Sequence, residues 1–318
     1  MHDIHPFLNS SLTGFAIVPD DGVILADGPD AGTFLQGQLS QDVLLMPVGH
    51  ARLAAFCSAK GRMQASFVVF KLSPERFALV CRQDLLAATL QRLSMFVMRA
   101  KVKLSNASDE FMCCGLLGSA GLSFFGTASD APPWTAVVQN QAQLVALHPA
   151  GGLFRALWLA PAGSTPPEGP ELSAQAWRLS EVLAGVAVVS APVVDAYVPQ
   201  MLNFESVGGV NFKKGCYPGQ EVVARSQFRG TLKRRGYIAK STAILQAGQE
   251  IFTAQDPEQA CGSVAMSALA LPADAQHMGS YAIVSLQTSS NQDLLHAGSA
   301  SGPQLTLMPL PYPLLEDI

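Results

Sequence analysis

The sequence has few charged residues, and it lacks the motifs of several common protein classes. Only 14% of its 318 residues are charged, against 49% that are hydrophobic. This composition is too apolar for a disordered protein and favours extensive packing of β-sheets. The net charge of −4 indicates neither a nucleic-acid-binding protein nor an acidic tail. The length allows two or three domains with a large buried core.

Motifs of several enzyme classes are missing. The chain contains no His-Glu-x-x-His, no P-loop and no Gly-x-Gly-x-x-Gly, so zincins, P-loop NTPases and dinucleotide-binding enzymes have no support. The six histidines lack ligand spacing, and we expect no metal site. The six cysteines include no Cys-x-x-Cys pair, and the N-terminus lacks the pattern of a secretory signal. We therefore expect free thiols in a cytoplasmic protein.

One long stretch has almost no charge. Between residues 111 and 154 the only formally charged residue is Asp130. Glycines at 115, 118, 121 and 126 interrupt its most apolar part, which is too broken for a membrane helix of about 20 apolar residues. We expect short buried strands joined by turns here, and no membrane partner.

Hydrophobic periodicity predicts an α+β fold. Residues 14–30 read as a β-hairpin around Asp20-Asp21-Gly22, followed by a helix with Asp30 as its N-cap. Further strands are expected over 52–56, 63–72, 77–81, 102–104, 112–117 and 137–147, and helices over 83–92 and 173–185, the second capped by Ser173. The repeated order of two strands and a helix indicates antiparallel sheets.

Composition also predicts how the chain divides. Residues 241–318 contain no Lys or Arg, seven acidic residues and many short β-like runs. The predicted units are a first α+β lobe (1–105), a second α+β lobe (106–206), a basic segment (207–240) and a C-terminal all-β lobe (241–318).

The basic segment differs in charge from the rest of the chain. Residues 207–240 hold eight of the 20 Lys and Arg residues and one acid, Glu221, which gives +7 against −11 elsewhere. A local positive field of this kind attracts an anion. The alternative is an ordinary solvated face that offsets nearby acids.

Within this segment, Cys216 lies in the most unusual run of residues. Gly215 and Gly219 bracket it, and both permit a positive φ or close backbone approach. Pro218 suits the first position of a helix, which would place Glu221 in the first turn. A thiol beside a helix N-terminus and two lysines has a lowered pKa and favours the thiolate. The alternative is an inert, packed thiol.

The same run resembles the signature of a known family. Lys213-Lys214-Gly215-Cys216-Tyr217-x-Gly219-Gln220-Glu221, with Arg225 and Arg229-Gly230, is similar to the signature of YgfZ-type folate-binding proteins, relatives of the glycine-cleavage T-protein (aminomethyltransferase). The likeness extends along most of the chain, and its other matching runs are Phe34-Leu35-Gln36-Gly37-Gln38, Lys60-Gly61-Arg62, Arg99-Ala100-Lys101-Val102, Pro199-Gln200 with Asn203, and Pro309-Leu310-Pro311-Tyr312-Pro313.

This resemblance implies a fold and a role. The fold is T-protein-like, with two α+β lobes and a C-terminal β-barrel around a central cavity. The ligand is tetrahydrofolate or a derivative. The role is the maintenance of iron–sulfur enzymes, including those that modify tRNA. The implied partners are such enzymes or their assembly proteins, and direct tRNA contact is left open.

The resemblance also implies which residues contact the folate and shows one departure. Trp177 and Arg178 match the helix that helps enclose the ligand, where an indole stacks on a pterin and a guanidinium binds a carboxylate. The alternatives are an ordinary core tryptophan and an exposed arginine. The Asp-Asp pair of the T-proteins becomes Ala65 and Ser66 here, and neither exchanges a proton near neutral pH as Asp does. Aminomethyl transfer by that route is therefore not expected.

Three functions remain open from the sequence. The first is a folate-binding factor without classical catalysis, which uses Cys216, Lys214 and Arg225 to engage a redox-labile partner. The second is a folate-dependent one-carbon transferase or demethylase with another base, Glu221 or Asp195. The third is direct RNA binding through residues 213–240, for which only three aromatic residues are available: Tyr217, Phe228 and Tyr237.

Overall fold

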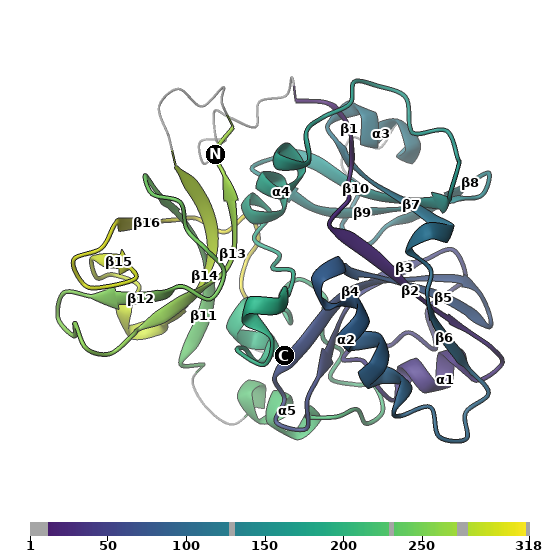
Figure 1. Cartoon of the computed structure of the whole chain (residues 1–318), viewed down its shortest axis with the longest axis horizontal. Helices are drawn as coiled ribbons and strands as arrows, with labels where there is room; N and C mark the ends of the chain where they lie inside the picture. The colour runs from purple at the N-terminus through teal and green to yellow at the C-terminus, as the bar shows by residue number, and fades with distance from the viewer. Residues whose placement is uncertain (1–11, 127–130, 229–231, 272–278, 316–318) are drawn as a thin grey trace.

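The computed structural model describes residues 12–126, 131–228, 232–271 and 279–315. Figure 1 shows two sheets stacked on one side of the molecule and a barrel on the other. The fold is α+β with antiparallel sheets and a closed C-terminal barrel of six strands, as predicted.

Sheet B is built almost entirely from the N-terminal part of the chain and has the order β3-β4-β5-β2-β6. Its strands are β2 (Asp21–Asp27), β3 (Ala51–Cys57), β4 (Met63–Ser73), β5 (Arg76–Arg82) and β6 (Lys103–Asn106). Two helices accompany it, α1 (Ala31–Gln36) and α2 (Gln83–Ser94). Helix α2 buries Leu85, Leu86 and Leu93, at the helical spacing expected from the sequence.

Sheet A has the order β1-β7-β10-β9-β8. Its strands are β1 (Gly14–Ile17), β7 (Phe111–Leu117), β8 (Ala136–Gln139), β9 (Ala142–Ala150) and β10 (Leu153–Pro161), with the short helix α3 (Ser119–Leu122) beside them. Helix α4 (Ala174–Leu183) lies between this sheet and the barrel (Figure 1). Ser173 caps α4 by accepting a hydrogen bond from the Ala176 amide, as predicted.

The barrel has the order β11-β14-β13-β12-β15-β16. Its strands are β11 (Arg234–Ser241), β12 (Glu250–Thr253), β13 (Gly262–Leu269), β14 (Ser280–Gln287), β15 (Leu295–Ala297) and β16 (Gln304–Met308). Strand β11 therefore comes from the basic segment. The tail after β16 returns to the lobes, where the Tyr312 hydroxyl donates to the Gly185 carbonyl at 2.6 Å.

Three local predictions were wrong. The strands at residues 14–30 form no hairpin: β1 pairs with β7 in sheet A, whereas β2 pairs with β5 and β6 in sheet B. The short link between β1 and β2 crosses from sheet A to sheet B, so the two strands hydrogen-bond to different neighbours and not to each other. Asp30 precedes α1 but makes no side-chain cap, because its carboxylate accepts from the Lys101 amide instead. The single strand expected over 137–147 is divided at Asn140, whose φ of 55° marks a turn.

Gly115 lets α4 pack closely on sheet A. A Cβ atom at this position would lie 2.2 Å from the indole carbons of Trp177, which is far inside van der Waals contact. Because Gly115 has no side chain, the Trp177 ring can lie directly against β7 at this position.

We predict that Gly115→Ala destabilises the protein by about 1–3 kcal/mol, because the added methyl overpacks the contact with Trp177. Urea unfolding followed by circular dichroism measures this change. Gly215→Ala is the matched control, since nothing lies within 4 Å of a Cβ there. Equal stability of the two variants would contradict the packing argument.

Candidate functional site

A partly enclosed cavity among the described residues lies between the two sheets. Its empty volume is about 610 Å³ when the open space at its mouth is included. Only about 60 Å³ of this volume is wide enough for the centre of a water molecule. Its walls come from sheet B, sheet A, α4 and the segment after α4, and no barrel residue lines it. The lining residues are Asp21, Leu53, Ser66, Phe67, Val68, Val80, Cys81, Trp134, Leu147, His148, Arg155, Leu157, Trp177, Glu181, Val186 and Val188. The cavity is thus narrow and mostly apolar, with a few polar groups.

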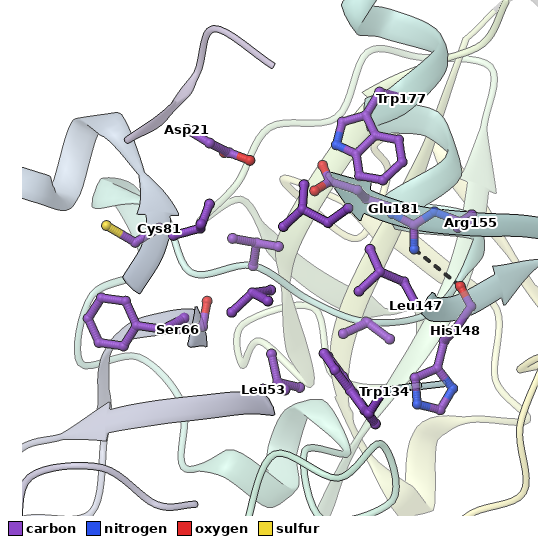
Figure 2. Close-up of a pocket in the computed structure, with 16 residues that line it drawn as sticks. Asp21, Leu53, Ser66, Cys81, Trp134, Leu147, His148, Arg155, Trp177 and Glu181 are labelled. Atoms are coloured by element: carbon purple, nitrogen blue, oxygen red, sulfur yellow. Dashed lines mark hydrogen bonds between the residues drawn. The ribbon is translucent and has the colours of Figure 1, made fainter. Parts of the chain in front are cut away.

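Figure 2 shows how these polar groups face one another. Asp21 and Ser66 lie on the side of sheet B, while Trp177, Glu181, Arg155 and His148 lie across the cavity from them. A flat ligand placed here would meet apolar side chains on its faces and polar groups at its edges.

Buried ion pairs join the two carboxylates of the cavity to α4 and sheet B. Arg82 on β5 donates to Asp21 at 2.5 Å and to Glu181 at 2.8 Å. Arg178 donates to Glu181 at 2.7 Å and lies 3.3 Å from Asp21. Burial raises the pKa of Asp21 to about 7, against the attraction of Arg82. Both carboxylates are therefore engaged by guanidinium groups.

Arg155 is the remaining cation of the cavity. Its side chain is 3% exposed, and its guanidinium carbon lies 4.6 Å from the centre of the Trp177 ring. The Nε atom donates to Ser180 Oγ at 2.9 Å, and Nη1 donates to the His148 carbonyl at 3.3 Å. Burial lowers the pKa of Arg155 to about 10, so it stays charged at neutral pH.

The structure places the two predicted folate residues differently. Trp177 lines the cavity and is 1% exposed, so it belongs to both the core and the cavity wall. Arg178 is half-buried and does not line the cavity. Its guanidinium instead forms ion pairs with Glu181 and Asp21.

Ala65 and Ser66, which the resemblance matches to the acid pair of the T-proteins, lie on β4. Ala65 is fully buried, and Ser66 lines the cavity, where its hydroxyl accepts a hydrogen bond from the Val189 amide at 2.9 Å. Sheet B therefore presents a hydroxyl to the cavity from this strand, and no carboxylate.

The first anchor of the signature is Lys214, which bonds to the end of α1 and to the segment just after it. The ammonium group of the buried Lys214 donates to the backbone carbonyls of Gln36 and Leu39 and lies 4.9 Å from the Tyr217 ring centre. Burial lowers the pKa of Lys214 to about 8, an effect that Asp42 and Cys216 oppose. Tyr217 is also buried, which raises the pKa of its hydroxyl. Lys214 is thus a structural cation.

Gly219 is the second anchor. It has a φ of 78°, and a Cβ there would lie 2.4 Å from the Ser58 carbonyl and 2.5 Å from the Gly61 Cα. Only glycine allows the start of α5 (Gln220–Phe228) to approach the β3–β4 turn this closely. Gly215, by contrast, has open space around it. The Pro218 prediction was wrong, since α5 begins two residues later, whereas Glu221 does lie in its first turn.

The exposed members of the signature are the ones that a partner could reach. The Cys216 thiol is exposed, and the side chains of Lys213, Glu221 and Arg225 are exposed near it in the chain, with Gln220 half-buried. None of these residues lines the cavity. The structure therefore does not bring the signature together with Trp177. Arg229 lies outside the described residues.

Several residues of the cavity escaped the sequence argument. Arg155 stands alone in the apolar run Leu153-Phe154-Arg155-Ala156-Leu157, which is a signal for a buried charge with a specific task. Trp134 and His148 carried no comparable signal. Among the residues that the structure describes, no group of three potential ligands could hold a metal ion, and no helix is long and apolar enough to span a membrane.

The chain is similar in sequence and in fold to several known proteins. Residues 21–130 match the model of the GCVT N-terminal domain. The chain is 32% identical to the tRNA-modifying protein YgfZ of Photorhabdus laumondii, over 98% of this chain and 96% of that one. It is 28% identical to the protein of the same name from Pectobacterium atrosepticum, over 98% and 95%. The crystal structure of the glycine cleavage system aminomethyltransferase T from Bartonella henselae has a similar fold, with a TM-score of 0.63 at 14% identity, over 96% of this chain and 87% of that one.

We predict that Lys214→Met destabilises the protein by about 1–3 kcal/mol, because the backbone carbonyls of Gln36 and Leu39 lose a buried donor. Cys216→Ser, at an exposed position, should change stability by less than about 0.5 kcal/mol. Chemical denaturation of both variants measures the difference. A Lys214→Met protein as stable as the parent would show that this lysine is no anchor.

Proposed function

This chain belongs to the YgfZ family, and from that membership we propose that it supports tRNA modification by binding a tetrahydrofolate-type ligand between sheets A and B. The relatives that share 28–32% of its residues are named tRNA-modifying proteins. The resemblance of the signature to this family adds iron–sulfur enzymes, or the proteins that assemble their clusters, as the partners served.

The observation that carries the folate proposal is the set of groups around the cavity. Two indole rings, Trp134 and Trp177, line it together with aliphatic side chains, which suits a flat heteroaromatic ring. Two buried donors remain available there: the Trp177 indole N–H has no hydrogen-bond partner among the described residues, and Arg155 has unused N–H groups. This combination of aromatic walls and free donors is the chemistry that supports a folate-type ligand. Tetrahydrofolate supplies ring nitrogen atoms that carry one-carbon units.

The carboxylates favour binding over group transfer. Asp21 and Glu181 line the cavity, but Arg82 and Arg178 hold both. Glu221 and Asp195, the bases required by a transferase or demethylase, do not line the cavity. Ser66 stands where β4 would otherwise present an acid, and its hydroxyl cannot exchange a proton with a bound folate near neutral pH as a carboxylate can. We therefore propose a factor that works without aminomethyl transfer.

The Cys216 segment is proposed as the contact for a protein partner. Lys214, Tyr217 and Gly219 hold this segment against the rest of the molecule, while the thiol between them stays exposed. A fixed backbone with a free thiol is suited to engage a redox-labile partner.

Direct RNA binding has weaker support. Two cations of the basic segment are used inside the protein: Lys214 on backbone carbonyls and Arg235 on the buried carboxylate of Glu205. This leaves fewer cations for phosphate contacts than the sequence suggests. An affinity for RNA that falls steeply as the salt concentration rises would favour direct RNA binding.

We predict that tetrahydrofolate quenches the tryptophan fluorescence of the protein saturably. Trp177→Phe should weaken binding several-fold, since that ring forms part of the cavity wall. Trp158→Phe is the control, because Trp158 lies on sheet A outside this cavity. Absence of both quenching and heat in calorimetry at millimolar ligand would eliminate folate binding.

We predict that Cys216→Ala lowers the activity of iron–sulfur tRNA-modifying enzymes in cells while leaving folate affinity unchanged. Mass spectrometry of modified nucleosides in tRNA, from cells that carry only the variant, measures this effect. Lys213→Gln removes an exposed neighbouring charge and separates the role of the thiol from that of the charge. Normal nucleoside levels in the Cys216→Ala cells would count against a thiol-based contact.

A further inference from the structure

Arg155 is a buried cation without a carboxylate partner among the described residues. The guanidinium has five N–H donors, and the structure gives it two acceptors, the Ser180 hydroxyl and the His148 carbonyl. Both acceptors are neutral. No carboxylate lies within salt-bridge distance of it in the described part of the chain, although its side chain is only 3% exposed. Burial of a charge in this state is costly, so a specific partner is expected.

The nearby acids do not fill this role. Glu181 is the closest carboxylate in electrostatic terms, but Arg82 and Arg178 both donate to it. Asp21 is shared by the same two arginines. Asp20 also pairs with Arg178, at 3.4 Å. The nearby carboxylates are thus all paired with Arg82 or Arg178, and Arg155 is the one guanidinium of this cluster without a carboxylate of its own among the described residues.

A second donor lies beside Arg155. The Trp177 ring stacks on the guanidinium, and its buried indole N–H has no acceptor among the described residues. Figure 2 shows both side chains on the same wall of the cavity. A cation with unused N–H groups in the cavity wall suits a ligand group that only accepts hydrogen bonds.

We propose that the cavity binds its ligand through oxygen atoms that accept hydrogen bonds from Arg155, so that this arginine recognises the electron-rich end of the ligand. The inference rests on the proposed folate function and deepens it. In a folate such oxygens occur in two places, the glutamate carboxylates and the carbonyl of the pterin ring. A donor edge, such as an amidine, would meet Arg155 with repulsion.

The test compares three ligands on the parent protein and on Arg155→Gln. The ligands are tetrahydrofolate, p-aminobenzoylglutamate, which has carboxylates and no pterin, and 6-methyltetrahydropterin, which has the ring carbonyl and no carboxylate. Isothermal calorimetry gives the dissociation constants. Arg155→Gln should weaken binding of tetrahydrofolate by about 10- to 100-fold, as expected for hydrogen bonds to a charged group. Arg99→Gln, at an exposed position outside the cavity, should leave it unchanged.

The two fragments identify the oxygen that Arg155 binds. Loss of p-aminobenzoylglutamate binding in the variant assigns a carboxylate, and loss of the pterin assigns the ring carbonyl. Equal affinities of parent and variant for tetrahydrofolate overturn the inference and leave the folate function intact. If tetrahydrofolate fails to bind the parent while p-aminobenzoylglutamate binds in an Arg155-dependent manner, the folate function fails and the inference stands.

Thermal unfolding without ligand separates recognition from a structural role. A buried cation that awaits an acceptor gives no net stability, so Arg155→Gln should melt at the same temperature as the parent or higher. A lower melting temperature in the variant would show that Arg155 serves the fold, and would overturn the inference whatever the ligands do.

Discussion

The buried ion-pair network of Asp21, Arg82, Glu181 and Arg178 is the constraint on which the cavity depends. It links β2 and β5 of sheet B to α4, which packs on sheet A. Charges buried to this degree are stable only when they are paired, so the network fixes the position of α4 relative to sheet B. Gly115 then sets how close the Trp177 ring lies to sheet A. Together these contacts hold two sheets at the separation that leaves the cavity open between them.

The sequence predicted most elements and missed how they connect. Helical periodicity located α2 and α4, and Ser173 identified the start of α4. Short apolar runs bounded by turn residues located most strands, several of which are buried on both faces. The prediction failed between β1 and β2, because an Asp-Gly turn looks the same whether the strands on either side pair with each other or with two different sheets. Long-range pairing is set by burial in the whole molecule, which local pattern does not record.

The site was predicted in part, for a similar reason. Trp177 was identified through resemblance, whereas Arg155 and Glu181 acquire their meaning only through the groups around them in space. The signature is a local motif, so its residues were found, but its anchoring was not: Lys214 reads as a free cation in sequence and is bound to carbonyls of Gln36 and Leu39 in the structure. Whether an arginine or lysine is structural depends on acceptors that lie far away in the chain.

The separation of Cys216 from the cavity determines how the two could influence each other. No signature residue lines the cavity, yet both features touch the same strand pair. Gly219 packs on the β3–β4 turn at Ser58 and Gly61, and β4 continues from that turn to Ser66 in the cavity wall. A ligand that shifts β4 would therefore change the surface on which the Cys216 segment rests. Any coupling between folate and a partner has a short physical route through this strand, and it needs no contact between the thiol and the ligand.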